Sequence, residues 1–308
     1  MTGSLEEISR KIDALGLWEK VWSCVFALRP AGTVLPYFCA FSKGDGHVVR
    51  ARLLLLEGWQ TFHDFMRLQH DRESGFVSST IELPQFVLVV LATGEAKVFR
   101  HDAGFVPREV DAAQAELCRR LLWEAYGVML RIESDPGTPM AYAAEQAMFS
   151  RVEGPSGTWR DAPFALVQPK VHVERVSIAK AVLAKAKDLP FASGEAVEVD
   201  FRLTPGVVTR EKRPRCAYQF VMLAAETGAV LFSSRASVDP ESGLRGIWEP
   251  SAMRLLDAFV KFGKVPGEVR LVSGRLFRLL RPLGEELPFK LSLHEALPHV
   301  AKFFNAPK

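Results

Sequence analysis

The sequence predicts an α+β first part made of hairpins and helices, followed by an α/β second part with a mixed five-stranded sheet. Three observations support this prediction. At 308 residues the chain is long for one compact domain and sufficient for two. The second half alternates strands with helices after an initial hairpin, whereas hairpins dominate the first half. Turn-forming residues are concentrated between the halves, so we expect domains at 1–133 and 164–308 with a linker at 134–163.

Composition supports two ordinary folded parts. Apolar residues make up 48% and charged residues 24% of the chain, as in an average globular protein, so each part can bury a core. The net charge of +3 is unevenly distributed: residues 155–308 carry 23 basic and 16 acidic residues, and the preceding residues carry 16 and 20. A basic half is typical of a protein with an anionic partner, although mutual attraction of two domains or ordinary scatter would give the same imbalance.

The spacing of the cysteines and the hydropathy of the chain indicate in which cellular compartment the protein is expected. Four cysteines (Cys24, Cys39, Cys118 and Cys216) share no close spacing, which predicts free thiols rather than a zinc site or a disulfide framework. The N-terminal residues are acidic where a secretory signal is basic and then apolar. The longest strongly apolar run, 86–92, is the size of a strand. We therefore expect a cytoplasmic protein with no membrane partner.

In the first half, Ser4 predicts the cap of a helix that Gly16 ends. Residues 34–41 and 47–56 are predicted strands, because the Gly-Asp-Gly sequence between them favours a hairpin turn. A helix over 57–68 follows, with its bulky apolar side chains on one face.

A second hairpin is expected from residues 86–91 and 96–100. Pro107 then opens a predicted helix that extends to about Leu130. In the linker, turn formers at 135–139 and 154–157 bracket a predicted short helix over 140–149.

The second half is predicted element by element. A strand over 164–173 precedes a helix over 177–187 that Ser177 caps. The remaining expected elements are strands at 196–203, 217–225, 229–237, 268–272 and 289–293, and helices at 250–262, 275–283 and 295–304. Pro250 suits a first helical residue and Gly263 suits a helix C-cap. Parallel pairing is expected across the helices, with right-handed crossovers.

This order of elements carries a resemblance. Residues 197–201 with Asp200, the hairpin at Glu226-Thr227-Gly228, and the segment 263–274 together resemble the integrase and transposase core of the ribonuclease-H-like superfamily over about residues 195–300. The whole chain is also similar to an uncharacterised bacterial domain-of-unknown-function family. The first resemblance implies a ribonuclease-H-like sheet, and the second implies no known activity.

The resemblance also implies which acids an active enzyme would need. In integrase-like enzymes, carboxylates from the first strand, the fourth strand and a later helix hold two metal ions. Asp200 matches the first-strand position, but the fourth-strand position falls at Val272 or Ser273, which are uncharged. An active enzyme would need Asp257 or Glu295 to complete the set with Mg²⁺ or Mn²⁺. Otherwise we expect no catalytic residues, no metal site and no cofactor.

Basic residues give the second candidate site. They are densest in the loop that carries Arg210, Lys212, Arg213 and Arg215, and Arg275 and Arg278 are expected to join them. Such donors on one surface suit phosphate contacts, although a solvated loop beside a charged helix face would have the same composition.

Three functions remain open. The leading interpretation is a catalytically silent ribonuclease-H-like module that binds or assembles something, with nucleic acid as one partner class. The first alternative is a metal-dependent nuclease or polynucleotidyl transferase with rearranged acids. The second is a module that binds only protein.

Overall fold

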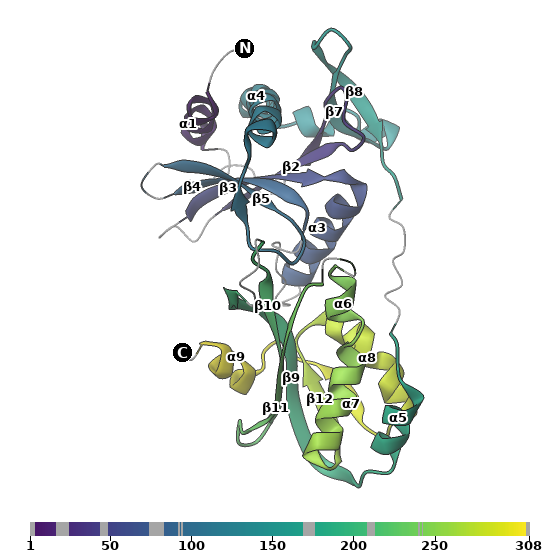
Figure 1. Ribbon diagram of the computed structural model, residues 1–308. Coiled ribbons are helices and arrows are strands. Elements are labelled where there is room, and N and C mark those ends of the chain that lie inside the picture. The colour runs from purple at the N-terminus through teal and green to yellow at the C-terminus, as the bar shows by residue number, and fades with distance from the viewer. Residues whose placement is uncertain are drawn as a thin grey trace. The chain divides into compact units, whose positions relative to one another are not determined.

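The computed structural model describes residues 4–16, 25–43, 49–73, 83–91, 93, 95–168, 176–207, 213–239, 241 and 243–305 (Figure 1). It divides into two compact units. The first comprises Met1–Met66, Leu83–Asp102 and Pro107–Lys170, and the second comprises Arg67–Glu82, Ala103–Val106 and Val171–Lys308.

An eight-stranded sheet forms the first unit, in the order β6-β5-β4-β3-β2-β1-β7-β8. Its strands are β1 (Val25–Arg29), β2 (Tyr37–Lys43), β3 (Val49–Glu57), β4 (Gln85–Leu91), β5 (Ala96–His101), β6 (Arg108–Glu109), β7 (Ala147–Glu153) and β8 (Trp159–Ala165). Neighbours are antiparallel except for β1 and β7, which are parallel. Both predicted hairpins of this half are confirmed as strand pairs, while the turn at 44–46 lies outside the described residues.

Helices cover both faces of this sheet. On one face, α1 (Leu5–Leu15) and α4 (Ala112–Ser134) bury a core that includes Phe26, Leu55 and Leu121. On the other face, α3 (Gly58–Glu73) places Phe62 against Phe38, with ring centroids 4.6 Å apart. Strand residues therefore alternate between two apolar environments, which explains why β3 and β4 read as continuous apolar runs.

The ends of α1 confirm the prediction. The Ser4 hydroxyl accepts a hydrogen bond from the amide of Glu7, and Gly16 adopts the left-handed conformation with a φ of 58°. The helix expected from Pro107 begins instead at Ala112. Asp111 caps it, and Gln114 completes a reciprocal capping box.

The short helix expected over 140–149 is wrong. Two 3₁₀ turns, Thr138–Met140 and Ala143–Glu145, replace the predicted helix over 140–149, and Gln146 then adopts a φ of 53°. The following residues form β7, which pairs with β1 and β8. A left-handed residue cannot continue an α-helix, and the partner strand β1 lies far away in the sequence. The division into domains at 1–133 and 164–308 stays a prediction.

A mixed five-stranded sheet forms the second unit, as predicted, in the order β11-β10-β9-β12-β13. Its strands are β9 (Phe191–Val207), β10 (Cys216–Ala224), β11 (Val230–Ser237), β12 (Val265–Leu271) and β13 (Lys290–Leu293). The first three are antiparallel, whereas β9, β12 and β13 are parallel. Parallel strands point toward the same side of a sheet, although β12 ends at Leu271 beside the middle of β9, which continues to Val207. We call the side where β9 and β12 end the carboxyl edge.

Helices lie on both faces of this sheet as well (Figure 1). One face carries α5 (Lys180–Lys187), α7 (Ser251–Phe262) and α8 (Gly274–Glu286), which share a core with apolar residues of the sheet. The short helix α6 (Arg245–Trp248) precedes α7, and α9 (Pro298–Asn305) covers part of the opposite face. Two expected helix starts are wrong: α5 begins at Lys180 without a side-chain cap, and α9 begins at Pro298.

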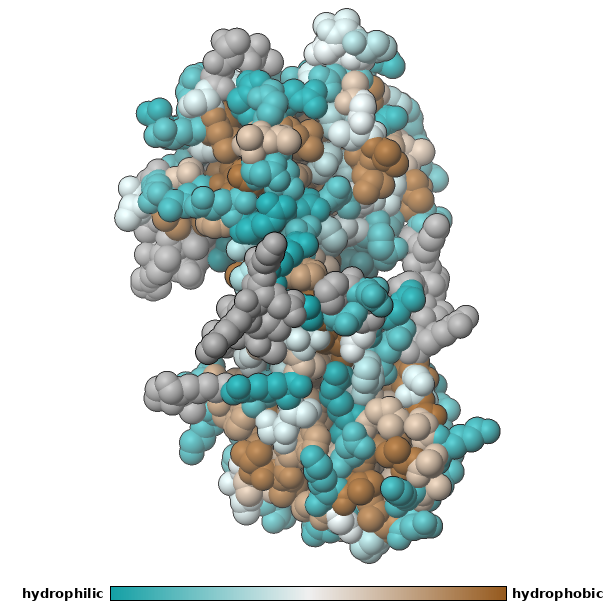
Figure 2. Space-filling view, viewed as in Figure 1, coloured by the Kyte–Doolittle hydropathy of each residue, from teal (hydrophilic) through white to brown (hydrophobic). Residues whose placement is uncertain are grey.

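Surface and thiol features complete the fold. Figure 2 shows apolar residues interspersed with polar ones on the visible face of both units, so apolar area alone does not single out a site there. Within the described part of the chain, no helix has the length and apolar character needed to cross a bilayer. Cys39, Cys118 and Cys216 are buried free thiols, as expected, and Cys24 is not among the described residues.

Candidate functional site

The side chains of β9 alternate between the two faces of the sheet, and this determines where its acidic residues point. Val197, Val199 and Phe201 pack in the core beneath α7. Because successive strand side chains alternate between faces, Glu198 and Asp200 project from the opposite face, which carries α9. Both acids are buried, with exposed fractions of 2% and 3%. A buried carboxylate needs internal donors, and each acid has its own.

Asp200 is held by its neighbours on the strand. Its carboxylate accepts hydrogen bonds from Nε of Arg202 at 2.6 Å and from the amide of Phe201 at 2.8 Å. The guanidinium of Arg202 lies 4.4 Å from the ring centroid of Phe304 in α9. Burial raises the pKa of Asp200, while Arg202 and the Phe201 amide oppose that rise. The Asp200 carboxylate is therefore occupied by internal donors.

Glu198 holds the start of α9. Its Oε2 atom accepts hydrogen bonds from the amides of His299 at 3.1 Å and Val300 at 3.0 Å. These amides belong to the first turn of the helix, where unpaired N–H groups and the helix dipole favour a negative charge. The sequence prediction missed this role. The alternation of apolar and acidic residues along 197–200 indicated the face, but the partner lies in a distant segment.

The other acids that an active metal-dependent enzyme would need, Asp257 and Glu295, do not lie beside Asp200. Asp257 is exposed on α7, which covers the opposite face of the sheet. Glu295 is exposed before α9 rather than inside a helix, and Val272 packs in the small apolar cluster beside α9. In the part of the chain that the structure describes, no group of three or more His, Cys, Asp or Glu side chains is arranged to hold a metal ion.

The predicted basic residues fall into two sets. Arg210 and Lys212 lie outside the described residues. The described members, which we call the edge arginines, are Arg213, Arg215, Arg275 and Arg278. The first two precede β10, whose start pairs with the end of β9, and the last two lie in the first turns of α8, which follows β12. The topology therefore places all four on the carboxyl side of the sheet, the first pair beside the end of β9 and the second pair beside the middle of that long strand.

Aromatic and carbonyl contacts position the two arginines before β10. The guanidinium of Arg213 lies 3.9 Å from the ring centroid of Phe105, a residue of the second unit. Nη1 of Arg215 donates to the carbonyl of Val238 at 3.0 Å. Arg213 is exposed and Arg215 is partly buried.

At the start of α8, positive charge lies against the helix dipole. Ser273 caps the helix by accepting a hydrogen bond from the amide of Leu276 at 3.1 Å, and the first turn contains no acidic residue. Arg275 stacks 4.1 Å from the ring centroid of Trp248, and Arg278 is exposed. Cations near a helix N-terminus are unfavourable by about 0.3–1 kcal/mol each. An anion bound here would remove that cost.

The start of α7 lies at the same edge. Pro250 provides no side-chain cap, and the first turn again lacks an acidic residue. Nη1 of Arg254 donates to the carbonyl of Ile247 at 2.6 Å. The Trp248 ring, which contacts Arg275 of α8, links the two helix starts. The arrangement can attract an anion through two helix N-termini together with Arg275 and Arg278 of α8.

A polar network missed by the sequence prediction lies across β12 and β13. Ser292 donates to Oε1 of Glu268 at 2.8 Å and contacts Nε2 of His294 at 3.1 Å. Burial raises the pKa of Glu268, but Arg270 and Ser292 outweigh it, and the net pKa is lowered. A carboxylate with a lowered pKa is a weak base, so this network does not activate Ser292 as a nucleophile.

The second unit is therefore a mixed α/β module with an arginine-bearing carboxyl edge. Residues 182–306 match the model of a family described as a domain of unknown function, DUF6930. The match includes the five-stranded sheet with α7, α8 and α9, and it supports a domain-of-unknown-function family for this part of the chain. No curated protein and no solved structure matches the chain.

Proposed function

We propose that the second unit is a ribonuclease-H-like scaffold that binds a phosphate-rich ligand, a nucleic acid backbone, at its carboxyl edge. The strand arrangement supports the fold assignment. Three antiparallel strands, β9 to β11, are followed by α7 and by β12, which pairs in parallel with β9. In this arrangement the first and fourth strands are neighbours, as integrase-like chemistry requires.

The placement of the edge arginines supports the ligand class and is the observation that carries the proposal. Segments far apart in the sequence bring these arginines to the carboxyl side of one sheet as two pairs, Arg213 and Arg215 beside the end of β9, and Arg275 and Arg278 after the end of β12, which lies beside the middle of β9. Two helix N-termini without acidic residues lie at the same edge. Ligands of open α/β sheets bind at the carboxyl ends of the strands. Arginine and helix N-termini both favour phosphate groups.

The acids argue against assigning two-metal chemistry to this edge. Asp200 accepts from Arg202 and Phe201, and Glu198 accepts from the first turn of α9. Asp257 lies on the opposite side of the sheet from both. A nuclease would need several of these carboxylates to converge on the metal ions. We therefore propose binding without a two-metal site. Bacterial origin and cytoplasmic location stay predictions.

The test is a binding titration of the full-length protein with fluorescein-labelled single-stranded and double-stranded DNA and RNA over a series of salt concentrations. Four phosphate contacts predict a slope of log K against log[salt] of about −3 for single strands and about −3.6 for duplex DNA. Arg275→Ala with Arg278→Ala should reduce the magnitude of that slope by about 1.4 to 1.8.

A matched control is Arg281→Ala. This arginine is exposed later on the same helix and pairs with Glu285 at 3.7 Å. The proposal expects its salt slope to equal that of the wild type. Weakening by Arg281→Ala to about half the extent caused by the Arg275/Arg278 pair, in proportion to the one charge removed instead of two, would mean that net charge alone drives binding. Absence of binding to every probe at low salt would refute the proposal.

A further inference from the structure

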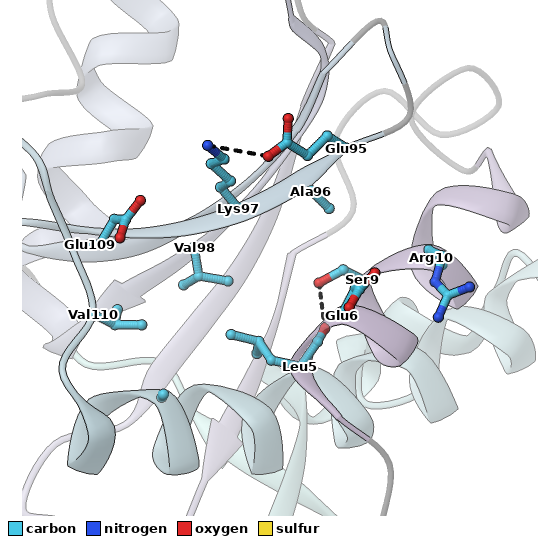
Figure 3. Close-up of a pocket in the computed structure, with 11 residues that line it drawn as sticks. Leu5, Glu6, Ser9, Arg10, Glu95, Ala96, Lys97, Val98, Glu109 and Val110 are labelled. Carbon is cyan, nitrogen blue, oxygen red and sulfur yellow. Dashed lines mark hydrogen bonds and ion pairs between the residues drawn. The ribbon is translucent and has the colours of Figure 1, made fainter.

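A cavity of about 520 Å³ lies in the first unit, beside α1 and strand β5 (Figure 3). Four consecutive residues contribute to its lining: Glu95, Ala96, Lys97 and Val98. Side chains of consecutive strand residues point to opposite faces, so one face of a strand cannot supply all four. The cavity therefore runs along the backbone edge of β5.

Hydrogen bonding shows which backbone groups of β5 point toward this edge. The amide of Leu91 donates to the carbonyl of Glu95 at 2.8 Å, which directs the backbone of Glu95 toward β4. In an antiparallel pair these directions alternate, so the N–H and C=O groups of Ala96 and Val98 point away from β4. Strand β6 pairs only with Phe99 and Arg100. Among the described residues, no strand pairs with the outer side of Ala96 and Val98.

After β6 the chain turns away from the edge of β5. After β6, Val110 lines the cavity, and Asp111 turns the chain into α4. The position beside β5 that a longer β6 would fill is therefore part of the cavity, and no described strand fills it. The open stretch spans three residues of β5, or about 10 Å at the rise of an antiparallel strand.

The walls combine apolar side chains with charged ones, the acids Glu6, Glu95 and Glu109 and the bases Arg10 and Lys97. Leu5, Val98 and Val110 lie between the two ends of the cavity in Figure 3, with Glu109 at one end and Arg10 at the other. Lys97 pairs with Glu95 at 3.2 Å, so these two charges satisfy each other. Within the described part of the chain, the carboxylates of Glu6 and Glu109 have no basic partner.

We infer that this cavity binds an extended peptide segment of another protein, which adds as a strand to β5 and carries a lysine or arginine beside Glu109. The backbone groups of Ala96 and Val98 would pair with the guest strand, as in other cases of strand addition. An apolar guest side chain would contact Leu5 and Val110. The carboxylates of Glu6 and Glu109 select a basic guest by charge complementarity. This site shares no residue with the carboxyl edge.

The test uses the full-length protein and two fluorescein-labelled probes, acetyl-KVKVT-amide and acetyl-EVEVT-amide, in an anisotropy titration. We expect saturable binding of the basic probe and at least about tenfold weaker binding of the acidic one, a difference of about 1.4 kcal/mol. Glu6→Lys with Glu109→Lys should reverse this preference. Glu145→Lys, an exposed change elsewhere in the first unit, should leave it unchanged.

A backbone variant separates strand addition from simple charge attraction. Ala96→Pro removes an N–H group that points away from β4, so it should weaken the basic probe without breaking the β4–β5 ladder. A thermal melt of each variant verifies that it is folded, and the charge-reversed variant decides the question if Ala96→Pro unfolds. Absence of saturable binding of the basic probe at millimolar concentration overturns the proposal. Binding that the Glu6/Glu109 reversal does not change also overturns it.

Discussion

Removing Arg202 tests whether Asp200 is a structural acid. Asp200 is 3% exposed, and among the described residues Arg202 is the only charged side chain that contacts its carboxylate. Arg202→Ala would leave a buried charge with one remaining donor, the amide of Phe201. Breaking a buried ion pair in this way costs about 3–5 kcal/mol. Protonation of Asp200 limits the loss, so we expect about 3 kcal/mol at neutral pH.

The reverse change should cost less. Asp200→Ala leaves Arg202, whose side chain is 29% exposed and can turn toward water. We expect a loss of about 1–2 kcal/mol. In the double variant the two losses should not add, and a coupling energy of about 1–2 kcal/mol is expected. Urea unfolding of the four proteins, with Arg281→Ala as an exposed control, measures each value.

The pH dependence gives a second readout of the same pair. Removing Arg202 raises the folded-state pKa of Asp200 further above its unfolded value, because burial then acts without the opposing cation. A raised acid pKa contributes stability below the unfolded pKa and loses it as pH rises through the folded pKa. The deficit of Arg202→Ala should therefore shrink on acidification. The reasoning would be refuted if Arg202→Ala had the same free energy of unfolding as the wild type, or if its loss of stability grew on acidification.

Three further predictions concern other parts of the chain. Glu198→Ala removes the acceptor of two amides of α9 and should lower the free energy of unfolding by about 2–4 kcal/mol in urea, whereas an unchanged value would contradict the capping role. Burial lowers the pKa of His101 from 6.5 to about 4, so the unfolded state binds more protons between these values. The wild type should therefore lose up to about 3 kcal/mol more than His101→Gln on acidification through this window, and parallel pH profiles would count against it. Gly267→Ala would bring a Cβ into the backbone carbonyl of Ser193 and should cost at least about 2 kcal/mol by thermal melting, unlike the open position Gly194→Ala.

Local signals predicted much of the fold. The cap at Ser4, the left-handed glycine at Gly16 and the two hairpins of the first half depend on neighbouring residues, and the structure confirms them. The order of strands and helices in the second half was also readable, because turn residues separate its apolar runs. The C-cap at Gly263, with a φ of 79°, is a further local feature that the sequence predicted.

Features that depend on distant partners were not predictable in this way. The strand β7 forms because β1 offers a parallel edge, while its own sequence suggested a short helix. Glu198 was overlooked because its partners His299 and Val300 lie 101 and 102 residues away in the chain. The sequence singled out Asp200 as an acid in a strand. It could not show that Arg202, two residues further on the same face, neutralises it.

The cavity of the first unit illustrates the same limit. Two of its acids, Glu6 and Glu109, belong to a helix and a two-residue strand that no sequence pattern connects. The open edge of β5 exists because β6 ends after pairing with two residues. Such an edge depends on where a neighbouring strand stops, and only the assembled sheet shows that.

The most direct test of the edge-arginine proposal is the salt dependence of nucleic acid binding by the full-length protein and its Arg275/Arg278 double alanine variant. The account predicts a wild-type slope of about −3 to −3.6, a shallower slope in the variant, and an unchanged slope in Arg281→Ala. Equal slopes in the wild type and the Arg275/Arg278 variant would contradict it.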